Sequence, residues 1–186
     1  MPNTFVNTSS AIGFDPVNMS ATALFAVGTR FSAAQNTEWV YVQAQTTIGA
    51  LSWVAINPTF SAGMASAADC VSGLQNLFGI ANATISASSY GWIAIRGENL
   101  SAIFTGTGSL AATSGELHLA SSAGPTGVVM LGTVGTASCT LQMQGVYLAA
   151  TASASASGLG VGIGGQLTAA NICLVNLYYP PRVVAV

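Results

Sequence analysis

One pair of side chains in this sequence could carry out acid–base chemistry. His118 and Glu116 stand two residues apart in the strand-like stretch GELHLA (115–120), so they share the strand face opposite Leu117 and Leu119. An imidazole beside a carboxylate can serve as a general base. An ordinary surface or interface histidine is the simpler interpretation of this pair.

Other catalytic arrangements are missing from the sequence. No serine has the GxSxG surroundings of a hydrolase nucleophile, and the five carboxylates are scattered singly, so no glycosidase-like pair is visible. GVGIGG (160–165) has the GxGxxG spacing of a dinucleotide-binding turn, but such a site needs an acid about twenty residues further on. No acidic residue follows Glu116. We therefore predict that the chain is not an enzyme.

The cysteines do not form a metal-binding pattern. Cys70, Cys139 and Cys173 are widely separated, lie among small or apolar neighbours and include no CxxC spacing. This setting is typical of buried free thiols, and a disulfide between two of them is also open. A zinc site would need carboxylates for which no local spacing exists. We predict no metal and no cofactor.

Charge is scarce along the whole chain. Lys and Arg together number three, Asp and Glu five, and charged residues make up 4% of the sequence, against about 25% in an ordinary domain. Such a surface protects a free monomer poorly from association, so we expect sister subunits or a larger assembly to cover much of it. Three separated arginines cannot form a phosphate-binding patch. The apolar runs are far shorter than the ~20 residues of a membrane helix, so we expect neither nucleic acid nor membrane as a partner.

Alternating apolar residues between glycine-rich turns predict an all-β fold. The expected architecture is a single β-sandwich or barrel-like domain of roughly nine or ten short strands. It spans residues 21–186 and follows an extended N-terminal arm over 1–20, which would be ordered only against a partner. TEWVYVQAQTTIGALSWVAIN (37–57) is predicted to be an antiparallel hairpin that turns at Gly49 and Ala50.

Two segments have less regular patterns. Residues 60–80 permit a short helix or a tight loop. The Ala/Ser/Gly-rich stretch 150–168 is either a flexible loop or a strand that packs closely on a neighbouring chain.

The two-residue period of a strand assigns side chains to its faces. In EWVYVQAQ, Val40 and Val42 share one face, whereas Trp39 and Tyr41 share the other. Later in the chain, SYGWIAIRGENLSAIFTG (89–106) alternates in the same way.

The tryptophans allow two interpretations. Trp39, Trp53 and Trp92 each lie in a strand-like segment, and Ile93 and Ile95 fall on the face opposite Trp92. Such rings either fill the core or cover the sheet. Alternatively, some of them anchor subunit contacts, because Trp, Tyr and Arg dominate binding hot spots.

Three stretches together resemble a known group of proteins. They are VGTRFSAAQNTEWVYVQAQTTIGALSWVAI (27–56), YGWIAIRGENL (90–100) and the terminal LYYPPRVV (177–184). They are similar to proteins encoded among the structural genes of tailed bacteriophages, usually taken to be capsid decoration (cement) proteins or unassigned virion proteins. The glycine-rich segment 158–165 is not part of that pattern.

The resemblance implies a small β-rich homotrimer that binds the outer face of an assembled head. Its partners would be the major capsid protein and sister subunits, and it would be located on the capsid surface of a virion assembled in the host cytoplasm. The candidate subunit or capsid contacts are aromatic and arginine side chains: Phe5, Phe14, Trp39, Tyr41, Trp53, Trp92, Arg96, Tyr178, Tyr179 and Arg182.

Two other functions are weighed against this one. The first is another virion component, such as a head-completion or tail-fibre-associated protein. The second is a carbohydrate-binding β-sandwich displayed on the particle, which would stack exposed Trp or Tyr rings on sugars. A glycan binder needs aromatic rings on a free surface beside polar side chains, whereas a cement protein buries them or turns them toward neighbours.

Overall fold

The computed structural model describes residues 14–33, 36–65, 77–105, 117–119, 129–131, 141–148 and 171–185. These residues form strands and loops and contain no helix, so the predicted all-β fold is confirmed. The strands are β1 (Arg30–Ala33), β2 (Thr37–Ala44), β3 (Trp53–Ile56), β4 (Ser61–Met64), β5 (Leu77–Ala81), β6 (Tyr90–Thr105), β7 (Leu117–Leu119), β8 (Val129–Leu131), β9 (Leu141–Leu148) and β10 (Asn171–Ala185).

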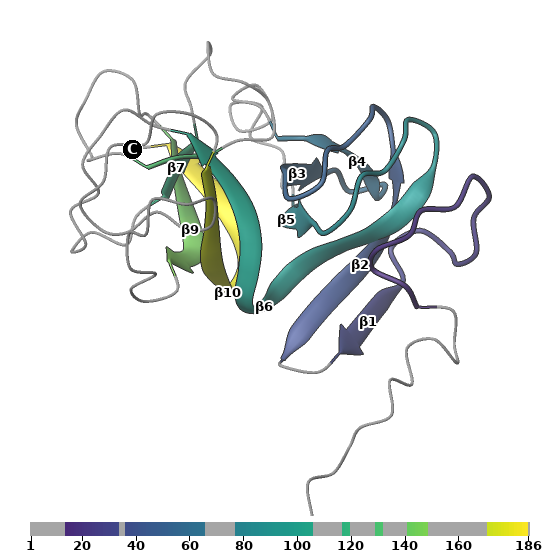
Figure 1. Ribbon diagram of the computed structural model, residues 1–186, viewed down its shortest axis with the longest axis horizontal. Coiled ribbons are helices and arrows are strands. Elements are labelled where there is room, and N and C mark those ends of the chain that lie inside the picture. The colour runs from purple at the N-terminus through teal and green to yellow at the C-terminus, as the bar shows by residue number, and fades with distance from the viewer. Residues whose placement is uncertain are drawn as a thin grey trace, which may run out of the picture.

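Five of the strands close into a barrel in the order β2-β4-β3-β5-β6, with β6 pairing back to β2 (Figure 1). The β2–β4 pair is parallel and the other four pairs are antiparallel. β1 continues this sheet beyond the first half of β2, with Phe31 opposite Trp39.

The hairpin predicted over 37–57 is wrong, because β4 lies between β2 and β3. The chain that follows β2 does not run back alongside β2 as the second strand of a hairpin. Ile48 instead forms backbone hydrogen bonds of 2.9 Å in both directions with Ile85, which is on the loop before β6. This bridge carries the chain across one end of the barrel, and β3 then pairs with β4 and β5.

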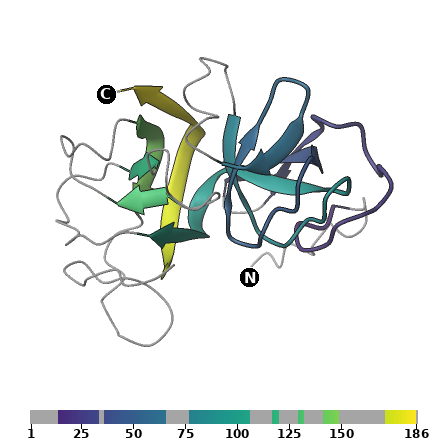
Figure 2. The same cartoon turned by 90° about the horizontal axis from the view of Figure 1, so that it is seen from above.

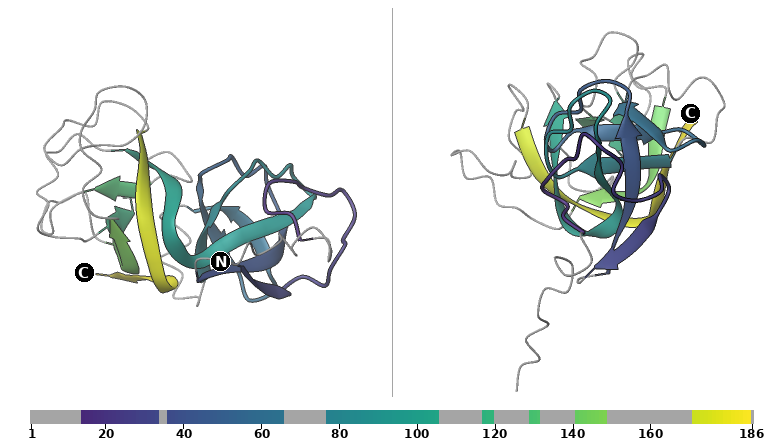
Figure 3. Two further views of the ribbon diagram at one scale, coloured as in Figure 1. Left: turned by 60° about the horizontal axis from the view of Figure 1, so that its bottom comes forward. Right: turned by 90° about the vertical axis from the view of Figure 1, so that its right-hand side faces the viewer.

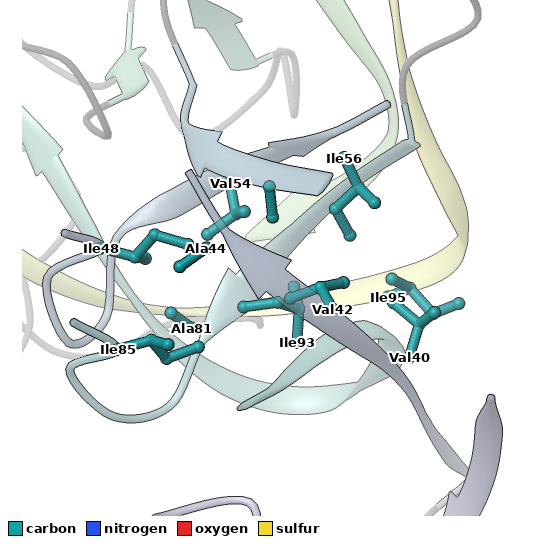
Figure 4. Packing of buried hydrophobic residues seen from close by; sticks show 11 residues of the cluster. Val40, Val42, Ala44, Ile48, Val54, Ile56, Ala81, Ile85, Ile93 and Ile95 are labelled. Atoms are coloured by element: carbon teal, nitrogen blue, oxygen red, sulfur yellow. The ribbon is translucent and has the colours of Figure 1, made fainter. Parts of the chain in front are cut away.

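Aliphatic side chains fill the barrel interior. The two-residue period assigned them correctly, since Val40 and Val42 point inward from β2 and Ile93 and Ile95 do so from β6. Burial of each such side chain contributes roughly 1.5–3 kcal/mol. The full interior set is Val40, Val42, Ala44, Ile48, Val54, Ile56, Ala62, Ala81, Ile85, Ile93 and Ile95 (Figure 4).

The segment 60–80 begins and ends in strands. Its first part forms β4 and its last part forms β5, so neither end takes the helix or tight loop that its spacing permitted. Residues 66–76 lie outside the described residues.

β6 is the longest strand and belongs to two sets of pairings. Its first half pairs with β2 and β5, and its second half pairs with β10 and β8 (Figures 1 and 2). A register shift marks the change, since Glu38 faces Arg96 whereas Trp39 faces Ala94. Gly97 follows with a φ of 150°, and a Cβ there would lie 3.1 Å from the side chain of Thr37. This close approach is one at which glycine fits best.

The second half of β6 starts another closed ring of pairings, β6-β10-β9-β7-β8 with β8 pairing back to β6. Its connectivity repeats that of the barrel. In each ring the first strand in sequence pairs in parallel with the third and antiparallel with the fifth, and the second strand pairs with the third and the fourth. The last strand of the barrel is thus the first strand of the second ring.

Candidate interaction surface

An aromatic cluster covers the outer face of β2 and β6. Trp39 and Tyr41 project from β2 and Trp92 from β6, on the faces opposite the barrel interior, as the two-residue period predicted. Phe14 completes the buried set, and its ring lies 4.1 Å from Phe31 and 4.9 Å from Trp92 between centroids. Offset-stacked and edge-to-face arrangements of this kind add about 0.5–1.5 kcal/mol per pair beyond area burial.

A strap, residues 14–29, lies over this aromatic cluster at the end of the molecule remote from β9 and β10 (Figure 3, purple). Ser20 and Tyr90 exchange two backbone hydrogen bonds of 2.9 and 2.8 Å. The backbone N–H of Leu24 donates to the hydroxyl oxygen of Tyr41 at 3.1 Å. Phe25 adds an edge-to-face contact with Tyr41, 5.3 Å between centroids. The strap is therefore held by its own chain.

The expected arm over 1–20 divides at Phe14. From Phe14 onward the chain belongs to the strap, and Phe14 itself is buried against the barrel. Phe5 and the rest of residues 1–13 lie outside the described residues, so for them the arm stays a prediction.

The strap exposes four large apolar side chains to solvent. Val17, Met19, Leu24 and Val27 are between 40% and 64% exposed, and together they form what we call the strap surface. Leu174 and Tyr178 on β10 are also large hydrophobic side chains that are exposed. Scattered exposed apolar residues are ordinary, but here four fall within eleven residues of one segment, which makes the strap a candidate interaction site.

Little charge accompanies the strap surface. The one carboxylate of the strap, Asp15, accepts hydrogen bonds from the Asn18 side chain at 2.6 Å and from the Val17 backbone N–H at 3.0 Å. These bonds hold the pKa of Asp15 below its ordinary value, and the bond from Asn18 has the larger effect. Arg30, which follows the strap, forms an ion pair of 2.9 Å with Glu38. The strap thus contains a single charged side chain, so apolar contact here would remove little charge from water.

The structure separates the predicted contact residues into three groups. Phe14, Trp39, Tyr41 and Trp92 meet in the aromatic cluster and are buried within the chain. Trp53 is buried elsewhere and donates its indole N–H to the Ile103 carbonyl oxygen on β6 at 3.2 Å.

The third group lies on β6 and β10. Arg96 is partly buried, and its Nε has no hydrogen-bond partner within the described part of the chain. Tyr178 is exposed on β10, and the same strand contains Tyr179 and Arg182. Sequence analysis missed the strap surface, since isolated apolar residues in a segment without periodicity give no signal before their exposure is known.

Most of the residues considered for chemistry lie outside the described ranges. His118 lies in β7 and Cys173 in β10, whereas Glu116, Cys70, Cys139 and the GVGIGG stretch are outside the described residues. Within the described ranges, no three His, Cys, Asp or Glu side chains are grouped so that they could hold a metal ion. The same ranges include no helix with the length and hydropathy of a membrane span.

The exposed apolar residues of the strap surface are therefore the candidate functional feature of the described chain. No protein-family model, curated protein or solved structure matches this sequence.

Proposed function

We propose that this chain is a non-catalytic structural protein of a bacteriophage particle, which binds the outer surface of the assembled capsid and stabilises it. The observation that carries the proposal is the strap surface, four exposed apolar side chains in one segment of a chain with 4% charged residues. The phage identity comes from the resemblance of residues 27–56 and 90–100 to virion structural proteins. The partners are then the major capsid protein and sister subunits in a homotrimer.

The strap surface suits a protein that acts by contact alone. Burial of apolar area stabilises a complex without requiring matched charges, at roughly 25 cal/mol per Å². Because Asp15 is the one charged side chain of the strap, docking there has to desolvate little charge. Hydrogen bonds and aromatic contacts already hold the strap against the barrel, so that little conformational freedom is lost on binding.

The burial of the tryptophans favours an assembly protein over a glycan-binding one. Trp39, Trp53 and Trp92 are each at most 7% exposed, so their faces are not offered to a sugar ring. Tyr178 on β10 is exposed, and Asn176 donates to its hydroxyl group at 3.4 Å. Another virion location, such as the head-completion complex or the tail fibre, would use the same kind of surface.

The test is to add the purified protein to phage heads that lack it, pellet the heads and measure their resistance to heat. We expect stoichiometric co-pelleting and raised resistance. The variant Val17→Ser with Leu24→Ser removes two apolar side chains of the strap surface and should weaken binding about tenfold or more, since each buried side chain contributes roughly 1.5–3 kcal/mol.

The matched control is Leu174→Ser, which removes an exposed leucine on β10, far from the strap. It should bind as the unmodified protein does. Absence of co-pelleting for the unmodified protein would refute the capsid role, and tails, necks and a glycan array would be tested next. Equal loss in the strap variant and the β10 control would refute the strap surface as the docking face.

A further inference from the structure

β1 presents one unpaired edge among the described residues. It stands at the end of the strand order, and its one partner in the described sheet is β2 (Figure 1). An unpaired edge offers a row of N–H and C=O groups to any extended chain.

A bulge at the start of β1 determines which backbone groups point outward. The Gly28 N–H donates to the Tyr41 carbonyl at 2.7 Å, while the Tyr41 N–H donates to the Thr29 carbonyl at 2.8 Å. Two residues thus face one, and Gly28 has a φ of +87°, which is the glycine-type bulge. Hydrogen-bonded pairs alternate along an antiparallel ladder. Phe31 and Ala33 therefore bond to β2, and the backbone groups of Arg30 and Ser32 point away from it.

The devices that usually protect an edge are weak here. Exposed edges are commonly blocked by a free lysine, a proline or an inward-pointing charge. On β1 the one charged side chain is Arg30, and its guanidinium is held by Glu38 at 2.9 Å. Arg30 and Ser32 are both exposed, so an incoming strand meets no bulky cover from the described chain.

The N-terminal segment is a suitable occupant in chemistry and reach. The described chain begins at Phe14, whose ring stacks on Phe31 of β1. The preceding residues 1–13 contain no charged side chain and include the strand-favouring run Thr4-Phe5-Val6. Thirteen extended residues span at most about 43 Å, enough to reach another copy.

We propose that residues 1–13 of a second copy of this chain add a strand to the free edge of β1. A second copy supplies the segment and the edge from one sequence, and a net charge of −2 opposes its approach only weakly. Main-chain hydrogen bonds to Arg30 and Ser32 form the contact, as in other cases of strand addition. The proposal concerns contacts between copies and does not depend on capsid binding.

The experiment measures the mass of the full chain in solution by light scattering after size-exclusion chromatography. The variant Ser32→Pro removes the outward N–H while leaving the bonds of Phe31 and Ala33 to β2, a position where an edge strand tolerates proline. Ser32→Ala is its matched control, because it changes the side chain and keeps the N–H. The double variant Phe5→Pro with Val6→Pro removes two N–H groups from the incoming segment.

We expect the unmodified chain and Ser32→Ala to be oligomers. Both proline variants should run at the single-chain mass of 18.6 kDa, with unchanged circular dichroism. Amide hydrogen exchange on the unmodified chain provides a check without substitution, since protection of the Arg30 and Ser32 amides should fall on dilution.

Three results would overturn the proposal. The first is an unmodified chain that is monomeric. If protection of its Ser32 amide from hydrogen exchange were also independent of concentration, residues 1–13 would pair with β1 of their own chain. The second is an oligomer that survives Ser32→Pro. The third is an oligomer that is lost in Ser32→Pro but kept in the N-terminal double variant, which would assign the edge to a different strand.

Discussion

The two rings of this chain have the same connectivity but are built from different sequences. The barrel strands β2, β3, β5 and the first half of β6 read TEWVYVQA, WVAI, LFGIA and YGWIAIRG, and they contain all three tryptophans. By position in the ring, β3, β4 and β5 of the barrel (WVAI, SAGM and LFGIA) correspond to β7, β8 and β9 (LHL, VML and LQMQGVYL). Leu, Met and Gln are prominent in β7 and β9, whereas β3 and β5 contain Trp, Phe, Val and Ile, which pack well on a pleated surface.

The connections differ as well. Residues 82–89 join β5 to β6 in the barrel, whereas residues 149–170, rich in Ala, Ser and Gly, join β9 to β10 in the second ring. The barrel also has the strap and an aromatic cluster on its outer face. One pairing scheme thus accepts very different sequences. The packing inside the barrel and on its outer face comes from aliphatic and aromatic residues that alternate along β2 and β6.

The largest effect is expected at the junction of the two rings. Trp53 is fully buried on β3, and its indole bonds to Ile103 in the half of β6 that belongs to the second ring. Trp53→Ala should lower the free energy of unfolding by about 3–5 kcal/mol, measured by urea denaturation followed by circular dichroism. Trp53→Phe keeps most of the volume and should cost less. A loss below about 1 kcal/mol for Trp53→Ala would mean that the rings do not depend on this contact.

A smaller effect is expected where β6 leaves the barrel. Gly97 has a φ of 150°, and a Cβ there would lie 3.1 Å from Thr37. Gly97→Ala should therefore lower the free energy of unfolding by about 1–3 kcal/mol, measured by the same denaturation. Gly63→Ala is the matched control on β4, because the nearest atom to its Cβ would be 3.7 Å away. Equal effects of the two substitutions would contradict a special requirement at the junction.

The smallest effect is expected at the start of the strap, a feature of the barrel side. The hydrogen bonds from Asn18 and Val17 lower the pKa of Asp15 from its ordinary value of 3.8. The ionised carboxylate thus contributes stability that is present above pH 3.8 and is lost as the pH falls through the lowered pKa. Because Asp15 lies at the surface, the contribution should be within about 0.5 kcal/mol.

An NMR titration of the Asp15 carboxyl carbon measures this directly. A midpoint below 3.8 is expected, and it should rise toward that value when Asn18→Ala removes the main donor. A midpoint at or above 3.8 in the unmodified chain would contradict the bonded turn.

The sequence predicted local structure well and long-range pairing poorly. The faces of Val40 and Trp39 on β2, and of Ile93 and Trp92 on β6, followed from the period of two because alternation is a property of the strand itself. The hairpin predicted over 37–57 is wrong, because β3, the next strand in sequence after β2, is not its neighbour in the sheet. In the structure β4 occupies that place.

The candidate site shows the same limit. Four of the aromatic residues singled out from the sequence, Phe14, Trp39, Tyr41 and Trp92, gather in the cluster on β2 and β6, and all four are buried within the chain. The exposed residues Val17, Met19, Leu24 and Val27 had no periodicity, so composition could not distinguish them from buried ones.

By itself the sequence determined an all-β chain with few charges and with particular residues on particular strand faces, since these depend on composition and on neighbours one or two positions away. Tertiary structure alone decided that β6 is shared between two rings, that one edge of β1 has no partner among the described residues and that the strap surface faces outward. Each of these depends on which distant segments meet, and that choice is governed by how the barrel interior fills and how its ends close rather than by any local pattern.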